Sequence, residues 1–171
     1  MITTEIPAET RIRTRRRTSP KRMPLGCPDS SPRLRIAVAD GDEGILEVYP
    51  GLLKILGHDV VSLSQSGYDL ADRCRTLKPD LVLVEKTLPD ADGLDIAEEI
   101  LQHRLIPIVL VTPGRSAAYT EQSLRRGVLA TLAKPFRLAE LREAIAHARR
   151  CFDQLDTIRQ CGLRLNELLK R

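Results

Sequence analysis

The 171-residue chain has no apolar run long enough to cross a membrane, because charges or prolines interrupt every such run well short of about 18 residues. It also lacks a glycine-rich phosphate loop, a nucleophile paired with a base, and a His/Cys spacing typical of a metal site. We therefore expect a soluble, cytoplasmic, non-enzymatic protein with reduced thiols. The isolated histidines and cysteines are His58, His103, His147, Cys27, Cys74, Cys151 and Cys161.

Positive charge is concentrated at the N-terminus, although the formal net charge is only +4. Residues 1–35 contain nine Arg/Lys against three Asp/Glu, whereas the rest of the chain contains 18 against 20. Prolines and the absence of apolar periodicity predict a disordered tail over residues 1–32. Its arginines could bind the phosphates of a nucleic-acid backbone. No aromatic residue lies between them to stack on bases, so we favour a solvated tail that binds no nucleic acid. The arginines are Arg11, Arg13, Arg15, Arg16 and Arg17, and initiation at Met23 instead of Met1 would remove them.

After this tail, short apolar runs alternate with segments of helical periodicity. Strands are expected at 34–39, 59–63, 81–84, 107–112 and 130–133, and helices at about 43–56, 66–77, 93–101, 116–126 and 138–171. Pro50 predicts a kink or a restart in the first helix. Strict alternation of this kind predicts an α/β fold over residues 33–150, with a five-stranded parallel, doubly wound, flavodoxin-like sheet.

Polar side chains follow four of the five expected strands. The carboxyl ends of parallel strands lie at one edge of a sheet, and ligands bind outside that edge. We therefore expect these side chains to gather in one pocket. They are Asp40 and Asp42 after the first strand, Glu85 after the third, Thr112 after the fourth and Lys134 after the fifth.

The segment 79–93 resembles the third strand and following loop of a response-regulator receiver domain, and the resemblance extends over 34–150. In that family an acidic pair after the first strand binds Mg²⁺, and an aspartate after the third accepts phosphate. A hydroxyl after the fourth strand and a lysine before proline contact the phosphate. Asp40, Thr112 and Lys134 match these positions. The resemblance implies a response regulator in phosphorelay-type, two-component signal transduction.

Three positions depart from the family pattern. Glu85 replaces the acceptor and moves the carboxylate by about 1.5 Å, which predicts loss of phosphorylation and hence a pseudo-receiver. Gly41 removes one member of the acidic pair, so we expect no cofactor, with Mg²⁺ binding through Asp40 weakened. Thr131 replaces the aromatic residue whose rotamer reports phosphorylation. The alternative is a metal-dependent, phosphorylatable receiver that uses Glu85 or Asp42.

The glutamate itself has two interpretations. Its carboxylate reaches towards Lys134 and Thr112 and partly imitates an aspartyl phosphate, which would hold the domain in one state. Alternatively, Glu85 only provides an ion pair, so that Lys134 is not left unpaired in a partly buried pocket. The sequence leaves both open.

The last segment, from residue 138, contains no proline and carries apolar residues at alternating steps of four and three. This spacing predicts that residues 151–171 project as a coiled coil and pair in a homodimer. A helix that folds back on its own domain is the alternative. The expected seam runs through Leu141, Ile145, Ala148, Phe152 and Leu155, and then shifts, as after a stutter near Gly162, to Ile158, Cys161, Leu165 and Leu168.

Residues 148–159 also resemble the linker coiled coil of ANTAR-type regulators, which join a receiver to a small RNA-binding module. The chain ends at Arg171, before such a module would begin, so RNA binding is not expected from this resemblance. The implied partners are a histidine kinase or an ANTAR-type regulator whose linker pairs with this helix. The rival class is a nucleic-acid-binding or transcription-regulating protein that uses the basic N-terminal arm.

Overall fold

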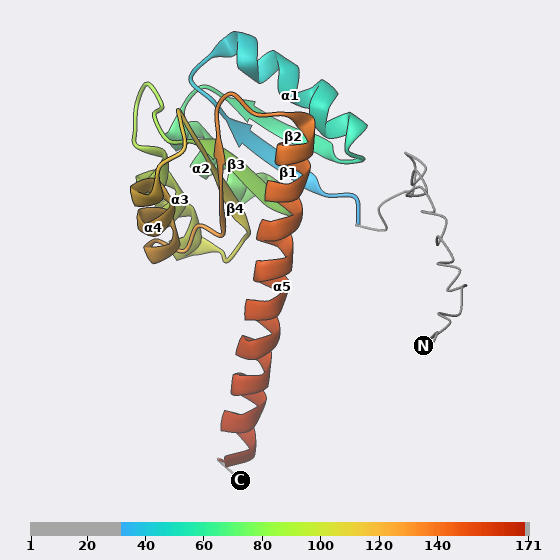
Figure 1. Cartoon of the computed structure of the whole chain (residues 1–171). Coiled ribbons are helices and arrows are strands. Elements are labelled where there is room, and N and C mark those ends of the chain that lie inside the picture. Colours follow the sequence, from blue (N-terminus) through green and yellow to red (C-terminus); the bar gives the residue numbers. More distant parts are fainter. Residues whose placement is uncertain (1–31, 170–171) are drawn as a thin grey trace, which may run out of the picture. The chain divides into compact units, whose positions relative to one another are not determined.

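The computed structural model describes residues 32–169, and within the last helix it describes side chains as far as residue 164. The tail predicted for residues 1–32, with its arginine run and both candidate start methionines, lies outside the described residues apart from residue 32. Five strands alternate with five helices (Figure 1). They are β1 (Arg35–Ala39), α1 (Glu43–Ile55), β2 (Asp59–Ser64), α2 (Gly67–Leu77), β3 (Leu81–Glu85), α3 (Gly93–His103), β4 (Ile108–Thr112), α4 (Ala117–Arg125), β5 (Ala130–Ala133) and α5 (Leu138–Leu169).

The strands form one parallel sheet in the order β2-β1-β3-β4-β5. The strand order reverses between β1 and β3, so the sheet is doubly wound, as the alternation predicted. β4 is buried along its whole length, and β3 is buried up to Glu85 at its end. The predicted fold class is confirmed.

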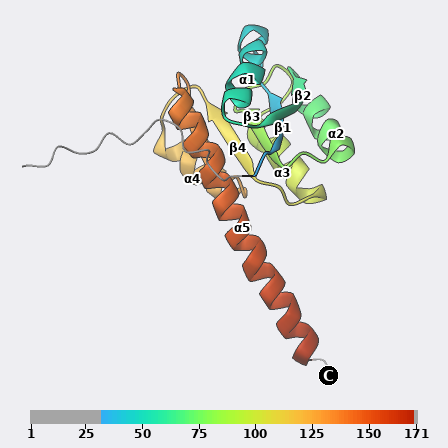
Figure 2. The same ribbon diagram turned by 90° about the vertical axis from the view of Figure 1, so that its right-hand side faces the viewer.

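Helices cover both faces of this sheet, and each face has its own core. Residues from α1 and α5 pack on one face, and residues from α2 and α3 pack on the other. Successive strand residues point to opposite faces, so Ile36 and Val38 join the first core while Ala37 and Ala39 join the second. Figure 2 shows α1 and α2 on opposite sides of β1 and β2.

The first helix continues through Pro50 without the expected restart. Proline removes a backbone hydrogen bond inside a helix, and both halves of the helix must then be held by packing. Leu46 and Tyr49 before the proline, and Leu53 after it, are buried on the same face of the sheet. This shared packing stabilises the helix on both sides of the proline.

The last helix, α5, continues well beyond the sheet (Figures 1 and 2). Leu141, Ile145 and Ala148 are almost fully buried against the sheet. Farther along, Leu155 is 55% exposed and Ile158 is 69% exposed. The first positions of the expected seam therefore belong to the domain core. Within residues 32–169, no helix combines the length and the apolar character that a membrane span requires.

Candidate functional site

Three of the expected side chains meet at the carboxyl edge of the sheet. The Lys134 ammonium nitrogen Nζ lies 2.7 Å from Asp40 Oδ2 and 2.6 Å from Glu85 Oε1. The Asp40 side chain is fully buried, and those of Lys134 and Glu85 are only 18% and 16% exposed. These residues, hereafter the ion triad, come from the ends of β1, β3 and β5.

Asp40 is held by two further donors. Its Oδ1 accepts the backbone N–H of Asp42 at 3.1 Å, and the Tyr49 hydroxyl donates to its Oδ2 at 3.4 Å. Tyr49 is only 1% exposed, and its burial, together with the Asp40 charge, raises the pKa of the phenol. Tyr49 was not among the predicted site residues. Only its place on the inner face of α1 could have indicated it.

The Glu85 carboxylate lies directly beside position 41. Glu85 Oε2 accepts the backbone N–H of Gly41 at 2.8 Å. A Cβ atom added to Gly41 would lie 3.5 Å from this oxygen and 3.3 Å from Pro89 Cδ. An aspartate at position 41 would bring a second carboxylate towards the first. Glycine at position 41 and glutamate at position 85 are therefore compatible with each other, because the missing side chain leaves room for the longer one.

Burial and charge act against each other in the ion triad. Burial raises the pKa of Asp40, and the Lys134 hydrogen bond offsets only part of this effect. Burial also acts to raise the pKa of Glu85, but hydrogen bonds from Lys134 and Gly41 outweigh it, so this pKa is lowered. The two carboxyl groups differ because Asp40 has lost all contact with water while Glu85 keeps some. Burial acts to lower the pKa of Lys134, but the two carboxylates outweigh it and the pKa is raised.

The donor set does not fit Mg²⁺. This ion requires near-octahedral oxygen ligands, whereas the Lys134 ammonium already lies between Asp40 and Glu85. The side chain of Asp42 does not join them, because its Oδ1 caps α1 by accepting the N–H of Ile45 at 3.2 Å. Among the described side chains, no three from His, Cys, Asp and Glu are grouped to hold a metal ion.

Comparison with known proteins now identifies the family. Residues 36–146 match the family model described as "Response regulator receiver domain". The chain belongs to the response-regulator receiver family. Like other receiver domains, it is a module of two-component signalling. The transcriptional regulatory protein PdtaR of Mycobacterium tuberculosis is 28% identical over 142 residues, which cover 83% of this chain and 69% of that protein.

Solved structures show the same receiver fold. A two-component response regulator of the LuxR family from Aurantimonas sp. superposes with a TM-score of 0.64 and 25% identity, over 67% of this chain and 84% of that chain. The receiver domain of a modulated diguanylate cyclase from Desulfovibrio desulfuricans gives a TM-score of 0.65 at 22% identity, over 72% of this chain and 98% of that chain. The second likeness shows the fold alone.

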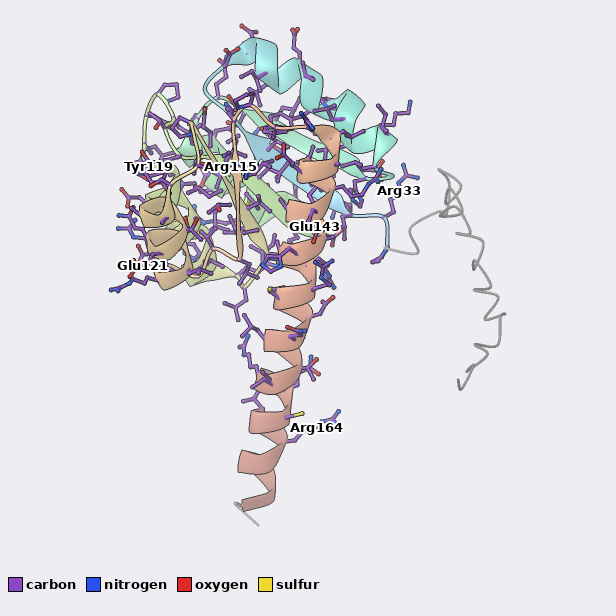
Figure 3. The ribbon with its side chains drawn as sticks, in the orientation of Figure 1. Arg33, Arg115, Tyr119, Glu121, Glu143 and Arg164 are labelled. Carbon is purple, nitrogen blue, oxygen red and sulfur yellow. The ribbon has the colours of Figure 1, made fainter. Side chains whose placement is uncertain are left out.

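The hydroxyl groups of the two threonines of the receiver pattern bond to groups outside the ion triad. Thr112 is buried, and its Oγ1 donates to the backbone oxygen of Gly114 at 2.9 Å. Thr131 is half-buried on β5, with its Oγ1 3.4 Å from that of Thr120 on α4. Thr131 also lines a groove of about 770 Å³ between α4, β5 and α5. Figure 3 labels two groove residues, Tyr119 on α4 and Glu143 on α5.

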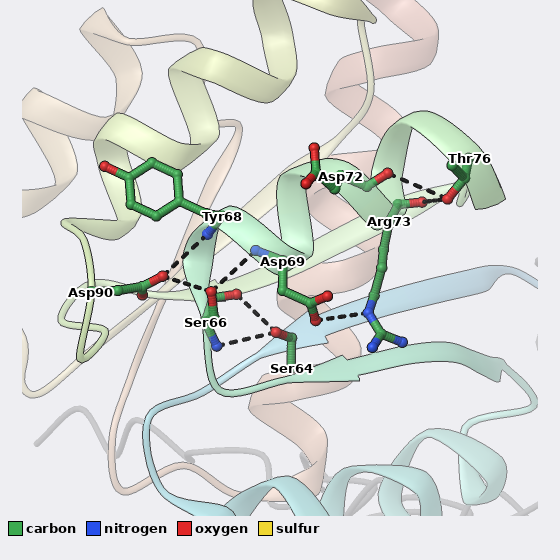
Figure 4. Close-up of polar contacts among 8 residues, drawn as sticks. All are labelled: Ser64, Ser66, Tyr68, Asp69, Asp72, Arg73, Thr76 and Asp90. Atoms are coloured by element: carbon green, nitrogen blue, oxygen red, sulfur yellow. Dashed lines mark hydrogen bonds and ion pairs between the residues drawn. The ribbon is translucent and has the colours of Figure 1, made fainter.

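The loop that follows Glu85 is tied to the start of α2 (Figure 4). Asp90 accepts hydrogen bonds from the Ser66 hydroxyl at 2.6 Å and from the Gly67 N–H at 2.9 Å. These bonds outweigh the effect of burial and lower the pKa of Asp90. At the other end of the loop, a Cβ atom on Gly93 would lie 2.0 Å from the backbone oxygen of Glu85. Only glycine at position 93 therefore permits this close approach of α3 to Glu85.

Proposed function

We propose that this receiver domain is not switched by phosphate and that it acts by binding protein partners. The observation that carries the proposal is the contact of Glu85 Oε1 with Lys134 Nζ at 2.6 Å. In the receiver family, the equivalent lysine contacts the phosphoryl group. Phosphoryl transfer depends on a correctly placed acceptor and on metal ions that neutralise charge. The longer Glu85 side chain misplaces the acceptor, and the ammonium of Lys134 takes the position of a cation.

The ion triad favours one fixed state of the pocket. Glu85 engages Lys134, which is one of the two contacts expected of a carboxylate that imitates a phosphoryl group. The other contact is missing, because Thr112 donates to Gly114 instead. We therefore propose a partial imitation, in which Lys134 is permanently engaged and Thr112 is not.

Incubation of the full chain with acetyl phosphate and Mg²⁺ is expected to leave its intact mass unchanged. The reason is that Glu85 is already bonded to Lys134 and to the Gly41 N–H, and is displaced from the position of an aspartate acceptor. A receiver domain with an aspartate acceptor, treated in parallel, should gain one phosphoryl group. A stoichiometric adduct on Glu85 would overturn the proposal.

We further propose that the domain dimerises through the free part of α5. Leu155 and Ile158 are each more than half exposed and lie on one side of the helix as an apolar stripe, and exposed apolar side chains gathered in this way mark a contact surface. A parallel coiled coil with a second copy buries it most simply. The same stripe could pair with the linker helix of an ANTAR-type regulator or with a histidine kinase.

The orientation of this stripe supports pairing with a second helix. At about 100° per residue, the positions of Cys151, Leu155, Ile158 and Gly162 centre about 75° from those of Leu141, Ile145 and Ala148, which face the sheet. A partner helix on the stripe would therefore not compete with the domain's own sheet. The stripe extends back to α5 residues that line the groove beside α4.

The new seam also needs no stutter. Beyond Ala148, which is buried in the domain core, Cys151, Leu155, Ile158 and Gly162 follow alternating steps of four and three residues. In this register Cys151 and Ile158 occupy the d positions of successive heptads, and Leu155 and Gly162 occupy the a positions. Of the shifted seam predicted from the sequence, the side chains of Leu165 and Leu168 lie outside the described residues.

Substitution Ile158→Lys is expected to weaken the dimer by about 2–3 kcal/mol, which corresponds to a rise in Kd of roughly 30-fold to 150-fold. A lysine in the seam would lose apolar burial and place two like charges opposite each other. Gln160→Lys is the matched control, because position 160 lies on the opposite side of the helix and the new charge would face Asp156 one turn away. Sedimentation equilibrium over a concentration series measures both. Equal dimerisation of the two variants would contradict the seam.

A further inference from the structure

His147 and Cys151 lie one turn apart on α5, where the helix leaves the sheet. The Cys151 sulfur Sγ is 3.6 Å from His147 Nε2. His147 is exposed and Cys151 is half-buried, so both can be reached from outside the domain. Neither side chain takes part in the ion triad.

The separation of these two atoms matches two ligands on one zinc ion. Zinc binds cysteine sulfur at about 2.3 Å and histidine nitrogen at about 2.0–2.1 Å, with tetrahedral angles. These values place a sulfur and a nitrogen on the same ion about 3.5 Å apart. One copy supplies only this pair, since no group of three such ligands occurs among the described side chains. A complete structural site needs two more ligands.

The dimer seam provides them. In the register above, Cys151 occupies a d position, and d residues of a parallel coiled coil face each other across the two-fold axis. His147 lies one turn earlier and borders the seam, so both copies bring the same pair to the axis at the same level. We propose that His147 and Cys151 form half of a Zn²⁺ site that the same two residues of a second copy complete. This inference rests on the parallel dimer proposed above.

The charges around the pair permit such a site. Two arginines lie between the ligands in sequence, and both are already paired on the same helix. Arg149 is 2.8 Å from Asp153, and Arg150 is 2.8 Å from Glu143. On binding, each Cys151 thiol would release its proton to solvent, and the two thiolates would balance the two charges of the ion. The metal would then fix the register of the two α5 helices at the point where they leave their domains.

Co²⁺ reports such sites because a tetrahedral cobalt–thiolate site absorbs in the near ultraviolet and, more intensely than hydrated cobalt, in the visible. Titration of the full chain with Co²⁺ and a phosphine reductant is expected to produce these bands. They should saturate at one ion for every two chains and disappear when Zn²⁺ displaces the cobalt. Cys151→Ser and His147→Ala should each abolish them. Cys161→Ser is the matched control and should leave them unchanged, because position 161 lies about 90° from the centre of the seam.

Sedimentation with and without a chelator separates this inference from the dimer itself. We expect dimers in chelator and at least a tenfold lower Kd with Zn²⁺. Dimers that give no cobalt bands would overturn the zinc site and leave the dimer standing. A chain that stays monomeric under both conditions would overturn both. Saturation at one ion per chain, or bands that persist in a folded Cys151→Ser variant, would overturn the shared site. Circular dichroism confirms that each variant is folded.

Discussion

Substitution Lys134→Met is expected to lower the free energy of unfolding by about 3–5 kcal/mol, because it removes the cation that compensates a buried charge. Asp40 is fully buried, and its remaining partners, the Asp42 N–H and the Tyr49 hydroxyl, carry no net charge. Each kcal/mol shifts the Tm of a domain of this size by about 2–4 °C, so the expected fall is roughly 6–20 °C. Scanning calorimetry and urea denaturation measure the two quantities.

Lys86→Met provides a matched control. Lys86 is also paired with a carboxylate, that of Asp92, but the Asp92 side chain is 39% exposed and can be hydrated when its partner is lost. A loss of only about 1 kcal/mol is expected for such a pair. The double variant Asp40→Asn with Lys134→Met should recover much of the stability, because no charge is then left buried. Equal losses for the two lysine variants would contradict a stabilising role of the ion triad.

The double variant Glu85→Asp with Gly41→Asp is expected to accept close to one phosphoryl group per chain from acetyl phosphate with Mg²⁺, whereas the unchanged chain is expected to accept none. The shorter side chain at position 85 withdraws the carboxylate by about 1.5 Å and frees the space beside position 41. The new aspartate then joins Asp40 as a second carboxylate for the metal ion. Intact mass spectrometry measures the gain.

The single variants distinguish the two contributions. Gly41→Asp alone should stay unphosphorylated, because its carboxylate meets that of Glu85 and the acceptor is unchanged. Glu85→Asp alone should react more slowly than the double variant, since only Asp40 remains to hold the metal. A folded double variant that gains no phosphoryl group would show that positions 41 and 85 are not what prevents the reaction.

The strand and helix order could be predicted from the sequence because each level of pattern agreed with the others. Apolar runs marked the strands, and Ser66 marked the start of α2, where its hydroxyl accepts the Asp69 N–H. Pro50 was the exception. The sequence shows the lost hydrogen bond, but not the packing on both sides of the proline that keeps α1 continuous.

Only the part of the candidate site that the ends of the strands position could be predicted from the sequence. Asp40, Glu85 and Lys134 meet because parallel strands bring their carboxyl ends to one edge. The side chains of Asp42 and Thr112 follow local hydrogen bonds instead, to the start of α1 and to Gly114. Such choices depend on the exact course of a loop, which periodicity does not specify.

The seam of α5 shows another limit of periodicity. Apolar spacing alone does not separate residues that face the domain's own sheet, such as Ile145, from residues that face outward, such as Ile158. The burial of the former and the exposure of the latter separate the two groups. The change of phase in the apolar pattern then marks the point at which the apolar side of α5 turns from the domain's own sheet to the outside.

Because α5 is one unbroken helix, a movement at its first turn is transmitted to its far end. The helix begins at Leu138, four positions after Lys134, and passes Ile158 without a break. At 1.5 Å per residue, the 20 positions from Leu138 to Ile158 span about 30 Å, so a tilt of about 5° at the sheet would displace Ile158 sideways by about 2.6 Å. A small rearrangement of the loop between Lys134 and the helix would thus be enlarged at the far end of α5, where it would shift the side chains of the proposed seam.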